Sequence, residues 1–523
     1  MRDFHLPGRS TVHALNGMAA TSHPLASLTA IDTLRAGGNA VDAALAAAFV
    51  LGLAEPQMCG IGGDCFVLLK PAGSEEVIAL NGSGRSPVGL SADALRAAGH
   101  EKMPIHGIET VTLPGAIDAF CRLHADHGRM ELDRILAPAI ACAEDGVPVA
   151  PRVAFDWADD LPVLRGRARE IYSLGGRAPH AGEVFRNPGQ AEVLRRIARD
   201  GRNGFYEGEV AEDMIASLRA LGGLHTLDDL AATACDYTTP IAGSYGGLEL
   251  LEHPPNGQGA TAILLLNILK SLDLKSLTPL GAQRAHLEAE ATKLAYDARN
   301  RFIADPAPRI GHMLSQATAD ALAALIDPAR AMANPAPLTE AIHRDTVYLT
   351  VVDRDRMAVS LIYSIFWGFG SGLASDRFGI NFQNRGAGFS LISGHPNEAG
   401  PSKRPMHTII PGMIRRAGRV IMPFGVMGGG YQPCGHARFV SNLADYGMDP
   451  QEAIDAPRSF AGPDGMEVER GYDDGIRAAL AQMGHSVSIP AIPLGGAQAI
   501  LIGEDGGLTG ASDPRKDGCA LGY

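Results

Sequence analysis

A change of character near residue 330 most constrains how this chain can fold. Before it, apolar residues mostly recur at helical spacing, as in Pro24–Ala36 and Ala40–Leu53, which Gly37-Gly38-Asn39 separates. After it, two runs rich in β-branched residues, TVYLTVVD and MAVSLIYSI, flank the turn residues 353–356. This order predicts an α+β domain in which helices cover sheets.

Other segments extend this pattern without an internal repeat or a long linker, so we expect one large domain. Expected helices cover residues 115–145, 190–232 and 281–303, and expected strands cover Cys65–Lys70, Gly379–Phe382, Met406–Ile414 and Ala497–Ile502.

Composition narrows the classes of partner. The 523 residues carry a formal net charge of −13, which argues against a phosphate backbone as ligand. The most apolar stretch, Ala43–Ala54, is too short to cross about 30 Å of hydrocarbon, and the first residues lack an apolar export segment. The seven scattered cysteines suit free thiols. We expect a cytoplasmic protein without nucleic acid or membrane as partner.

The boundary Asp345–Thr346 carries the candidate chemistry, because a Pro-rich segment (residues 331–345) ends there and a strand begins. A threonine hydroxyl is a feeble nucleophile that needs an adjacent base. If Thr346 becomes the first residue of a chain, its own α-amine, with an ordinary pKa of about 7.7–8.0, can accept the proton. The alternative is structural, since threonine commonly opens a strand.

Three further features favour the chemical interpretation. Ser364 lies at the far end of the paired strand, where its hydroxyl can reach that of Thr346. The run Gly428-Gly429-Gly430 can present backbone N–H groups to an oxyanion. GFGSG at residues 368–372 permits a sharp turn near both.

Motifs along almost the whole chain carry a family resemblance. They are GGNAVDAA (37–44), EPQMCGIGGDCF (55–66), LPGAIDAF (113–120), DTVYLTVVDRD (345–355), GFGSG, KRPMHTIIP (403–411), EAIDAPR (452–458) and GASDPRKDG (510–518). In this order they resemble the γ-glutamyltransferase family of N-terminal-nucleophile hydrolases.

The resemblance implies a four-layer αββα sandwich that cuts itself between Asp345 and Thr346. Residues 1–345 and 346–523 would then form a heterodimer, with pairing of two such heterodimers left open. It also implies that Ser364 supports the nucleophile and that the amides of Gly428 and Gly429 form the oxyanion hole. Neither a metal nor an organic cofactor is implied.

Departures from the family pattern bear on the substrate. The arginine that holds the glutamate α-carboxylate is replaced by Ser83, and the acidic residue that binds the α-amine by Gly388. Paired serines become His407-Thr408, a pocket asparagine becomes Phe366, and a histidine after the nucleophile becomes Tyr348. A charged α-amine would lose its counter-ion here, which is costly in a closed site.

The donors that remain suit a small carboxylate without an amine. Arg85, Arg385 and His407, with Thr408 beside them, are the expected substrate contacts, while Phe366 narrows the pocket and Tyr431 lines it. Ordinary ion pairs or core packing are the competing interpretations for each. The pattern resembles the oxamate amidohydrolase branch, so hydrolysis of oxamate to oxalate and ammonia is the leading hypothesis. The alternatives are a γ-glutamyl hydrolase or transferase, another acylase, and a non-catalytic binding protein.

Overall fold

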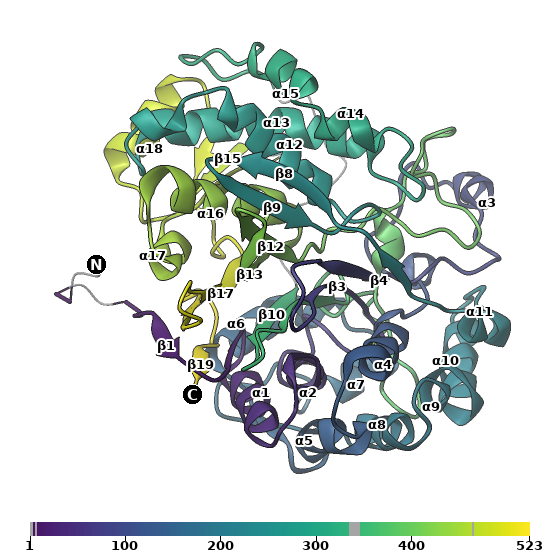
Figure 1. Cartoon of the computed structure of the whole chain (residues 1–523). Coiled ribbons are helices and arrows are strands. Elements are labelled where there is room, and N and C mark those ends of the chain that lie inside the picture. Colours follow the sequence, from purple (N-terminus) through teal and green to yellow (C-terminus); the bar gives the residue numbers. More distant parts are fainter. Residues whose placement is uncertain (1–3, 6–7, 334–345, 463–464) are drawn as a thin grey trace.

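Two seven-stranded sheets lie face to face at the centre of the molecule (Figure 1). The computed structural model describes residues 4–5, 8–333, 346–462 and 465–523. Sheet A contains, in spatial order, β1 (Val12–Ala14), β18 (Leu508–Ser512), β17 (Gly496–Ile502), β13 (Arg419–Met427), β12 (Gly412–Arg416), β9 (Leu248–Glu252) and β8 (Ile241–Tyr245). Sheet B contains β19 (Ala520–Gly522), β2 (Met18–Thr21), β10 (Val347–Val352), β11 (Ala358–Ser364), β3 (Asp64–Lys70), β4 (Ile78–Gly82) and β7 (Asp236–Thr238). Neighbouring strands in both sheets are antiparallel.

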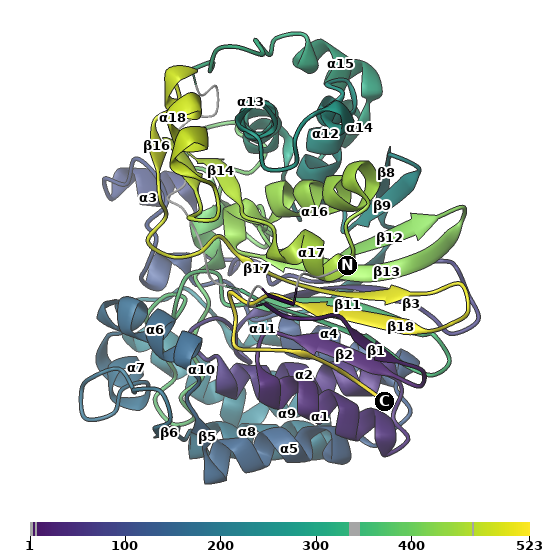
Figure 2. The same ribbon diagram turned by 90° about the vertical axis from the view of Figure 1, so that its left-hand side faces the viewer.

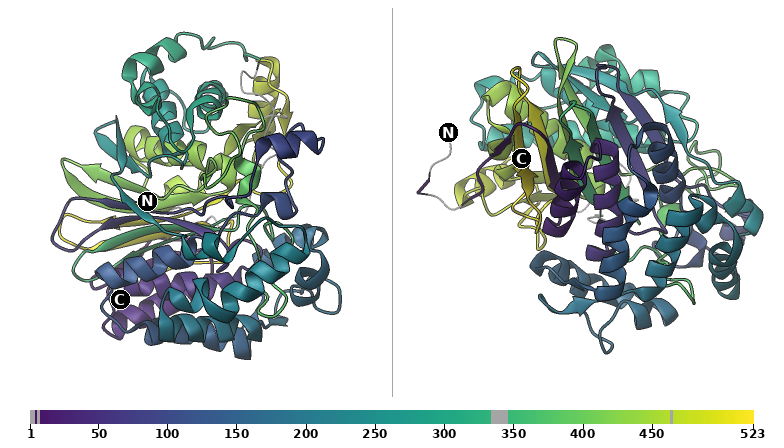
Figure 3. Two further views of the ribbon diagram at one scale, coloured as in Figure 1. Left: turned by 90° about the vertical axis from the view of Figure 1, so that its right-hand side faces the viewer. Right: turned by 60° about the horizontal axis from the view of Figure 1, so that its bottom comes forward.

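Helices cover the outer face of each sheet, which gives the four layers seen edge-on in Figure 2 and, from the opposite side, in Figure 3. Against sheet B lie α1 (Pro24–Arg35), α2 (Ala40–Ala54) and α4 (Ala116–His127), and outside them α5 (Leu132–Asp145) packs on α2 and α8 (Pro188–Asp200) on α5. Against sheet A lie α12 (Gly259–Lys270) and α16 (Gln432–Tyr446), and α13 (Ala282–Phe302) packs on α12. The predicted αββα sandwich is therefore confirmed.

Helix α2 shows how the amino-acid composition of a helix determines its position in these layers. All its residues are buried, as expected for a helix that is apolar on every side. Its many alanines allow close approach to β10 and β11 on one side and to α1 and α5 on the other. A capping box formed by Asn39 and Asp42 satisfies the first backbone N–H groups, which would otherwise be buried without partners.

Apolar side chains, including the large ring of Tyr348, fill the space between the two sheets. Tyr348 of β10 lies against Gly425 of β13, where a Cβ atom would come within 2.4 Å of the ring. Strand β13 thus approaches β10 closely. Strand β10 begins directly after Thr346, and β13 ends directly before Gly428. The apolar group that contains Tyr348 also includes Phe66, Ile362, Ile409 and Met427.

Several local predictions are confirmed and others are wrong. The helices at residues 24–36 and 40–53 and the hairpin around residues 353–356 are present. Gly379–Phe382 forms no strand and has only an isolated bridge between Ala374 and Asn381. In Met406–Ile414 the ladder begins only at Gly412, because the earlier residues bond to a loop through His407 N and Asn256 O.

The expected contrast between a helical first part and a strand-rich second part is also too simple. Both sheets contain strands from before residue 330 and strands from after residue 346, and α16 comes late in the chain. Most of the Pro-rich segment 331–345 lies outside the described residues. All seven cysteines are free thiols, as predicted. Within the described ranges, no helix combines the length and apolar character needed to cross a bilayer.

Candidate active site

Three neighbouring central strands of sheet B, β10, β11 and β3, have ends that lie side by side. Strand β10 begins directly after Thr346, and β11 ends at Ser364, which pairs with Asp64 at the start of β3. The Thr346 hydroxyl donates to Ser364 Oγ at 3.4 Å, and both side chains are fully buried. This distance exceeds that of an ordinary O–H···O bond, although contacts of a nucleophile are often loose before substrate binds. Strand pairing therefore places the two hydroxyls side by side.

Arg385 extends this pair into a buried network. Its Nη2 donates to Ser364 Oγ at 3.3 Å, and its Nη1 donates to Thr408 Oγ1 at 3.0 Å. The side chain is fully buried, and its guanidinium carbon lies 4.0 Å from the centre of the Phe366 ring. A buried cation over an aromatic face is stabilised by the ring quadrupole. The fork of the guanidinium is thus held beside the Thr346–Ser364 pair.

Phe366 adopts an unusual backbone conformation, with φ of 85°. A bulky residue in the left-handed region costs on the order of 1–3 kcal/mol, and such residues gather at functional sites. The turn directs the Phe366 amide to Ser364 Oγ at 2.9 Å and puts the ring beneath Arg385. Gly368 follows, where a Cβ atom would come within 2.1 Å of the Asp160 carboxylate.

Asp64 and His407 form a second buried pair at these strand ends. His407 Nε2 lies 3.2 Å from Asp64 Oδ2, while its Nδ1 accepts from the Ile409 amide at 3.4 Å, so Nε2 carries the proton. Asp64 Oδ1 accepts from the amides of Gly84 and Gly115 and from Gln383, at 2.8, 3.1 and 2.8 Å. Burial raises the pKa of Asp64 to about 6, although the Arg385 charge and these hydrogen bonds oppose the rise.

The glycine loop after β13 contains the two residues whose amides are predicted to form an oxyanion hole. Gly428 and Gly429 have φ of 116° and 52°, which favour glycine over any other residue. The described contacts hold the loop through its carbonyl oxygens. Gly428 O accepts from the Tyr431 amide, Gly429 O from Gln258 Nε2 and Gly430 O from the Tyr296 hydroxyl. Hydrogen bonds to its carbonyl oxygens therefore hold the loop in place.

Gln258 links this loop to the Arg385 network. It is fully buried, and its Nε2 donates to Thr408 O at 2.6 Å and to Gly429 O at 2.9 Å. Its Oε1 accepts from Arg299 Nη1 at 3.1 Å, which fixes the orientation of the amide. One side chain therefore sets the distance between the glycine loop and Thr408.

These contacts join most of the residues predicted from the sequence. A continuous path runs through Thr346, Ser364, Arg385, Thr408, Gln258 and Gly429. Phe366 joins it at Ser364 and Arg385, and Gly428 is the neighbour of Gly429. His407 adjoins Thr408 in sequence and is paired with Asp64.

Two predicted substrate contacts lie outside this path. Arg85 donates to Asp305 at 3.3 Å and to Ser402 O at 3.1 Å, and 41% of its side chain is exposed. Tyr431 is buried against Phe460 and Arg458 in the helical layer over sheet A. Their contact with substrate stays a prediction. Asp345 lies outside the described residues.

Sequence reasoning did not identify Asp64, Gln258 or Arg299. Asp64 had a usable signal, because an acidic residue opens the apolar run CFVLLK and such a charge must be paired when buried. Gln258 and Arg299 carried no comparable signal, since their partners lie far away in the sequence.

Comparison with known proteins gives matches that span almost the whole chain. The family profile described as Gamma-glutamyltranspeptidase matches residues 26–523. The glutathione hydrolase-like YwrD proenzyme of Bacillus subtilis is 34% identical, over 97% of this chain and 98% of that protein. The oxamate amidohydrolase proenzyme of Klebsiella pneumoniae is 35% identical, over 97% and 98% respectively. The crystal structure of cephalosporin acylase from Bacillus halodurans matches with a TM-score of 0.91 and 36% identity, over 100% of this chain and 99% of that one.

Proposed function

The chain belongs to the gamma-glutamyltranspeptidase family of self-processing amidohydrolases, and from this premise we propose where it cuts itself and what it hydrolyses. The bond that breaks is Asp345–Thr346, and residues 1–345 and 346–523 remain associated as the active enzyme. The substrate is a small amide that carries a carboxylate, with oxamate as the first candidate.

Thr346 serves both processing and turnover in this proposal. Its Oγ attacks the Asp345 carbonyl, the peptide becomes an ester, and water releases Asp345 and the free α-amine of Thr346. That amine then accepts the hydroxyl proton while Oγ attacks the substrate amide. Ammonia leaves, and water hydrolyses the ester on Thr346 to release the acid. The buried contact with Ser364 Oγ supports this role, because it orients the Thr346 hydroxyl.

Stabilisation of the tetrahedral intermediate falls to the amides of Gly428 and Gly429. Preorganised N–H groups aimed at a developing oxyanion contribute several kcal/mol in other acyl-transfer enzymes, where removal of one donor costs about 2.7–4 kcal/mol. The left-handed conformations of both glycines and the carbonyl anchoring of their loop support this assignment.

The position of Arg385 is the observation that supports the proposed substrate class. In oxamate the carboxylate is bonded directly to the amide carbon, so it must lie within a few ångströms of the attacking oxygen. Arg385 Nη2 is 3.3 Å from Ser364 Oγ, which is the hydrogen-bond partner of Thr346. Its fork suits bidentate binding of a carboxylate. Thr408 and the Phe366 ring hold the guanidinium in place.

A γ-glutamyl substrate is less well accommodated because it also brings a charged α-amine. At the family's acidic position stands Gly388, whose carbonyl accepts from Asn397 Nδ2 at 2.6 Å. The buried Asp64 carboxylate of the site cannot replace the missing acidic residue, because it already pairs with His407, Gln383 and two backbone amides. An ammonium group in such surroundings would be costly.

A substrate panel tests this proposal directly. The purified, processed enzyme should release ammonia from oxamate, and N-terminal sequencing should find a fragment that begins at Thr346. γ-Glutamyl anilide, glutathione and a cephalosporin side-chain amide serve as competing substrates. Turnover of γ-glutamyl anilide without any turnover of oxamate would reject the proposed substrate.

Arg385→Lys separates carboxylate binding from general damage. Lysine keeps the charge but loses the fork, so KM for oxamate should rise by about 10-fold or more, as expected when a charge-assisted contact worth about 1.5–3 kcal/mol is weakened. Arg284→Lys, at another fully buried arginine that pairs with Glu288, is the matched control. Equal KM values for the two variants would remove Arg385 from the binding role.

A further inference from the structure

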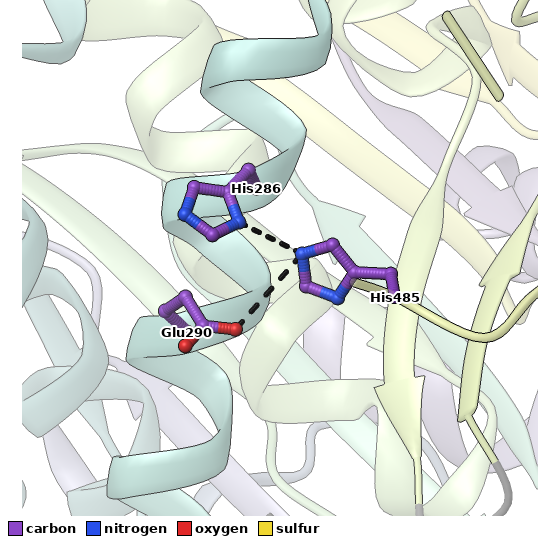
Figure 4. A group of neighbouring side chains, drawn as sticks. All are labelled: His286, Glu290 and His485. Carbon is purple, nitrogen blue, oxygen red and sulfur yellow. Dashed lines mark hydrogen bonds and ion pairs between the residues drawn. The ribbon is translucent and has the colours of Figure 1, made fainter. Parts of the chain in front are cut away.

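Three buried side chains in the helical layer over sheet A converge at a place that the proposed reaction does not use (Figure 4). His286 and Glu290 stand one turn apart on α13, so they share a face of the helix. His485 lies in the connection between α18 (Asp474–Gln482) and β16 (Val487–Ser488). We call these residues the His–Glu–His cluster.

The atoms that face each other in the His–Glu–His cluster are all potential metal ligands. His286 Nδ1 lies 2.8 Å from His485 Nε2, and His485 Nε2 lies 3.9 Å from Glu290 Oε1. With one ligand atom taken from each residue, the three atoms lie within 4.8 Å of one another. Around a tetrahedral zinc ion with bonds of 2.0–2.1 Å, ligand atoms are about 3.3 Å apart. The observed separations therefore lie on either side of the value that zinc requires.

Hydrogen bonds around the His–Glu–His cluster orient these atoms. His286 Nε2 lies 2.8 Å from Asp327 O, and since a carbonyl only accepts, Nε2 carries the proton and the Nδ1 lone pair faces the cluster. A histidine ligand that donates its other N–H to a backbone carbonyl is the usual arrangement at metal sites. Because His286 Nδ1 is an acceptor, His485 Nε2 donates to it across the 2.8 Å contact.

We propose that His286, Glu290 and His485 bind a divalent transition-metal ion, zinc being the first candidate. Imidazole nitrogen and carboxylate oxygen are the donors that such ions prefer, and three protein ligands leave one position for water. Without the ion, a proton occupies the short contact between His485 Nε2 and His286 Nδ1. When the ion binds, this proton moves to His485 Nδ1, and both facing nitrogens become ligands.

Lys293 competes with the ion for the Glu290 carboxylate. Its ammonium group donates to Glu290 Oε1 at 2.7 Å, so it occupies one ligand atom and repels a cation. It also donates to Met332 O at 2.8 Å, while the Met332 amide donates to Glu290 Oε2 at 2.8 Å. Metal binding must displace the lysine contact with Oε1 but can leave the Met332 amide in place.

The His–Glu–His cluster would connect both products of the proposed cleavage. Helix α13 and Met332 precede Thr346 in the chain, whereas His485 follows it. This consequence, unlike the metal site itself, rests on the proposed function. An ion bound here would link residues 1–345 to residues 346–523.

Metal titration of the full-length protein tests the proposal. Protein without a histidine tag is stripped with a chelator and titrated with Co²⁺, followed by visible absorption, and with Zn²⁺ in competition with a chromogenic chelator. One ion per chain should bind, with the intense visible bands of tetrahedral cobalt. His485→Asn and Glu290→Gln should weaken zinc binding by ~100-fold or more, beyond the 10–100-fold typical of lost outer-sphere partners. His312→Asn, at an exposed histidine on α14 (Ile310–Leu314), should change nothing.

Lys293→Met provides a gain of function that misfolding cannot imitate. Removal of the competing ammonium should tighten zinc binding by about tenfold, equivalent to about 1.4 kcal/mol. The same titration of Thr346→Ala, in which the chain should stay intact, keeps this test independent of cleavage. Equal zinc affinity in wild type and His485→Asn, or no tightening in Lys293→Met, would overturn the metal site.

Discussion

At the scale of single residues, the described site contains fully buried charged groups, among them Arg385 and Asp64. Arg385 is held by Ser364, Thr408 and the Phe366 ring, and its charge opposes the rise in the pKa of Asp64. In the low dielectric of a closed site these charges act strongly on one another and on any substrate. Residue substitutions here should therefore change chemistry more than packing.

Thr346→Ala should give a full-length chain without amidase activity, because processing and turnover lose the same hydroxyl. Thr346→Ser keeps a hydroxyl and should still be cut, although more slowly. Intact mass spectrometry after long incubation measures both. Thr350→Ala is the matched control, since Thr350 lies on β10, the strand that begins directly after Thr346, and its hydroxyl donates to Val359 O. A Thr346→Ala chain that splits at the same bond would place the nucleophile elsewhere.

Asp64→Asn should alter how stability depends on pH. Since the folded-state pKa of Asp64 is raised to about 6 from an ordinary 3.8, the folded chain retains a proton that the unfolded chain has lost between these values. Its contribution to stability therefore falls as pH rises through this window, by about 3 kcal/mol in total. The asparagine side chain of the variant does not titrate, so the variant does not lose stability in this way as pH rises.

The measurement uses the uncut Thr346→Ala background, so that one chain unfolds. Denaturant unfolding at pH 4 and pH 6 gives the free energy of unfolding of each protein. The difference between the Asp64→Asn variant and its parent should shift by about 2 kcal/mol in favour of the variant at the higher pH. Parallel pH curves would show that Asp64 titrates normally.

At the scale of elements, the site is built where strand ends and loops from both sheets converge. Strand pairing alone brings Thr346, Ser364 and Asp64 together. The glycine loop comes from the other sheet, and its position depends on the contact between Gly425 and Tyr348 and on Gln258. Loops on a rigid sheet scaffold can in this way hold donors within the tolerance that catalysis needs.

Gln258→Glu should lower kcat by about 10–100-fold with little change in KM, because the glycine loop shifts while Arg385 still holds the substrate. A carboxylate lacks the N–H groups that bond to Thr408 O and Gly429 O. The fall is expected to be smaller than the 100–1000-fold loss seen when an oxyanion donor itself is removed.

Gln432→Glu is the matched control for that substitution. Gln432 is also fully buried, but its Oε1 accepts from the Ile410 amide, a contact that glutamate preserves. Both variants bury a new carboxylate, but Gln258→Glu also loses the hydrogen bonds donated to Thr408 O and Gly429 O. Steady-state kinetics with equal kcat for the two variants would show that Gln258 has no positioning role.

At the scale of the whole molecule, the two proposed fragments are interleaved. Strands β10 and β11, which follow Thr346, lie between β2 and β3, which precede it. In sheet A, β12 pairs with β9 on one side and with β13 on the other. Separation of the fragments would therefore break strand ladders in both sheets and expose the core between them.

The cleaved enzyme should therefore keep both fragments together without a covalent link. An affinity tag on the C-terminal fragment should retain residues 1–345 in native buffer, and the fragments should separate only in strong denaturant. Native mass spectrometry would also report whether two heterodimers associate. Loss of the untagged fragment during a native wash would contradict the interleaved arrangement.

The sequence by itself determined the local elements and the family-specific residues. Alanine-rich α2, the hairpin of β10 and β11, and the Thr346–Ser364 pair follow from patterns within a short stretch, so they could be predicted. Gly379–Phe382 shows the limit, because its residues resemble a strand but no neighbouring ladder accepts them.

Only the tertiary structure decided which distant residues become partners. Gln258 donates to Gly429 O, and Asp64 pairs with His407. Arg85 forms an ion pair with Asp305 and lies outside the Arg385 network. Such contacts depend on how the two sheets and their loops stack, since a side chain reaches only a few ångströms. Local periodicity carries no information about that stacking, which therefore had to come from the fold.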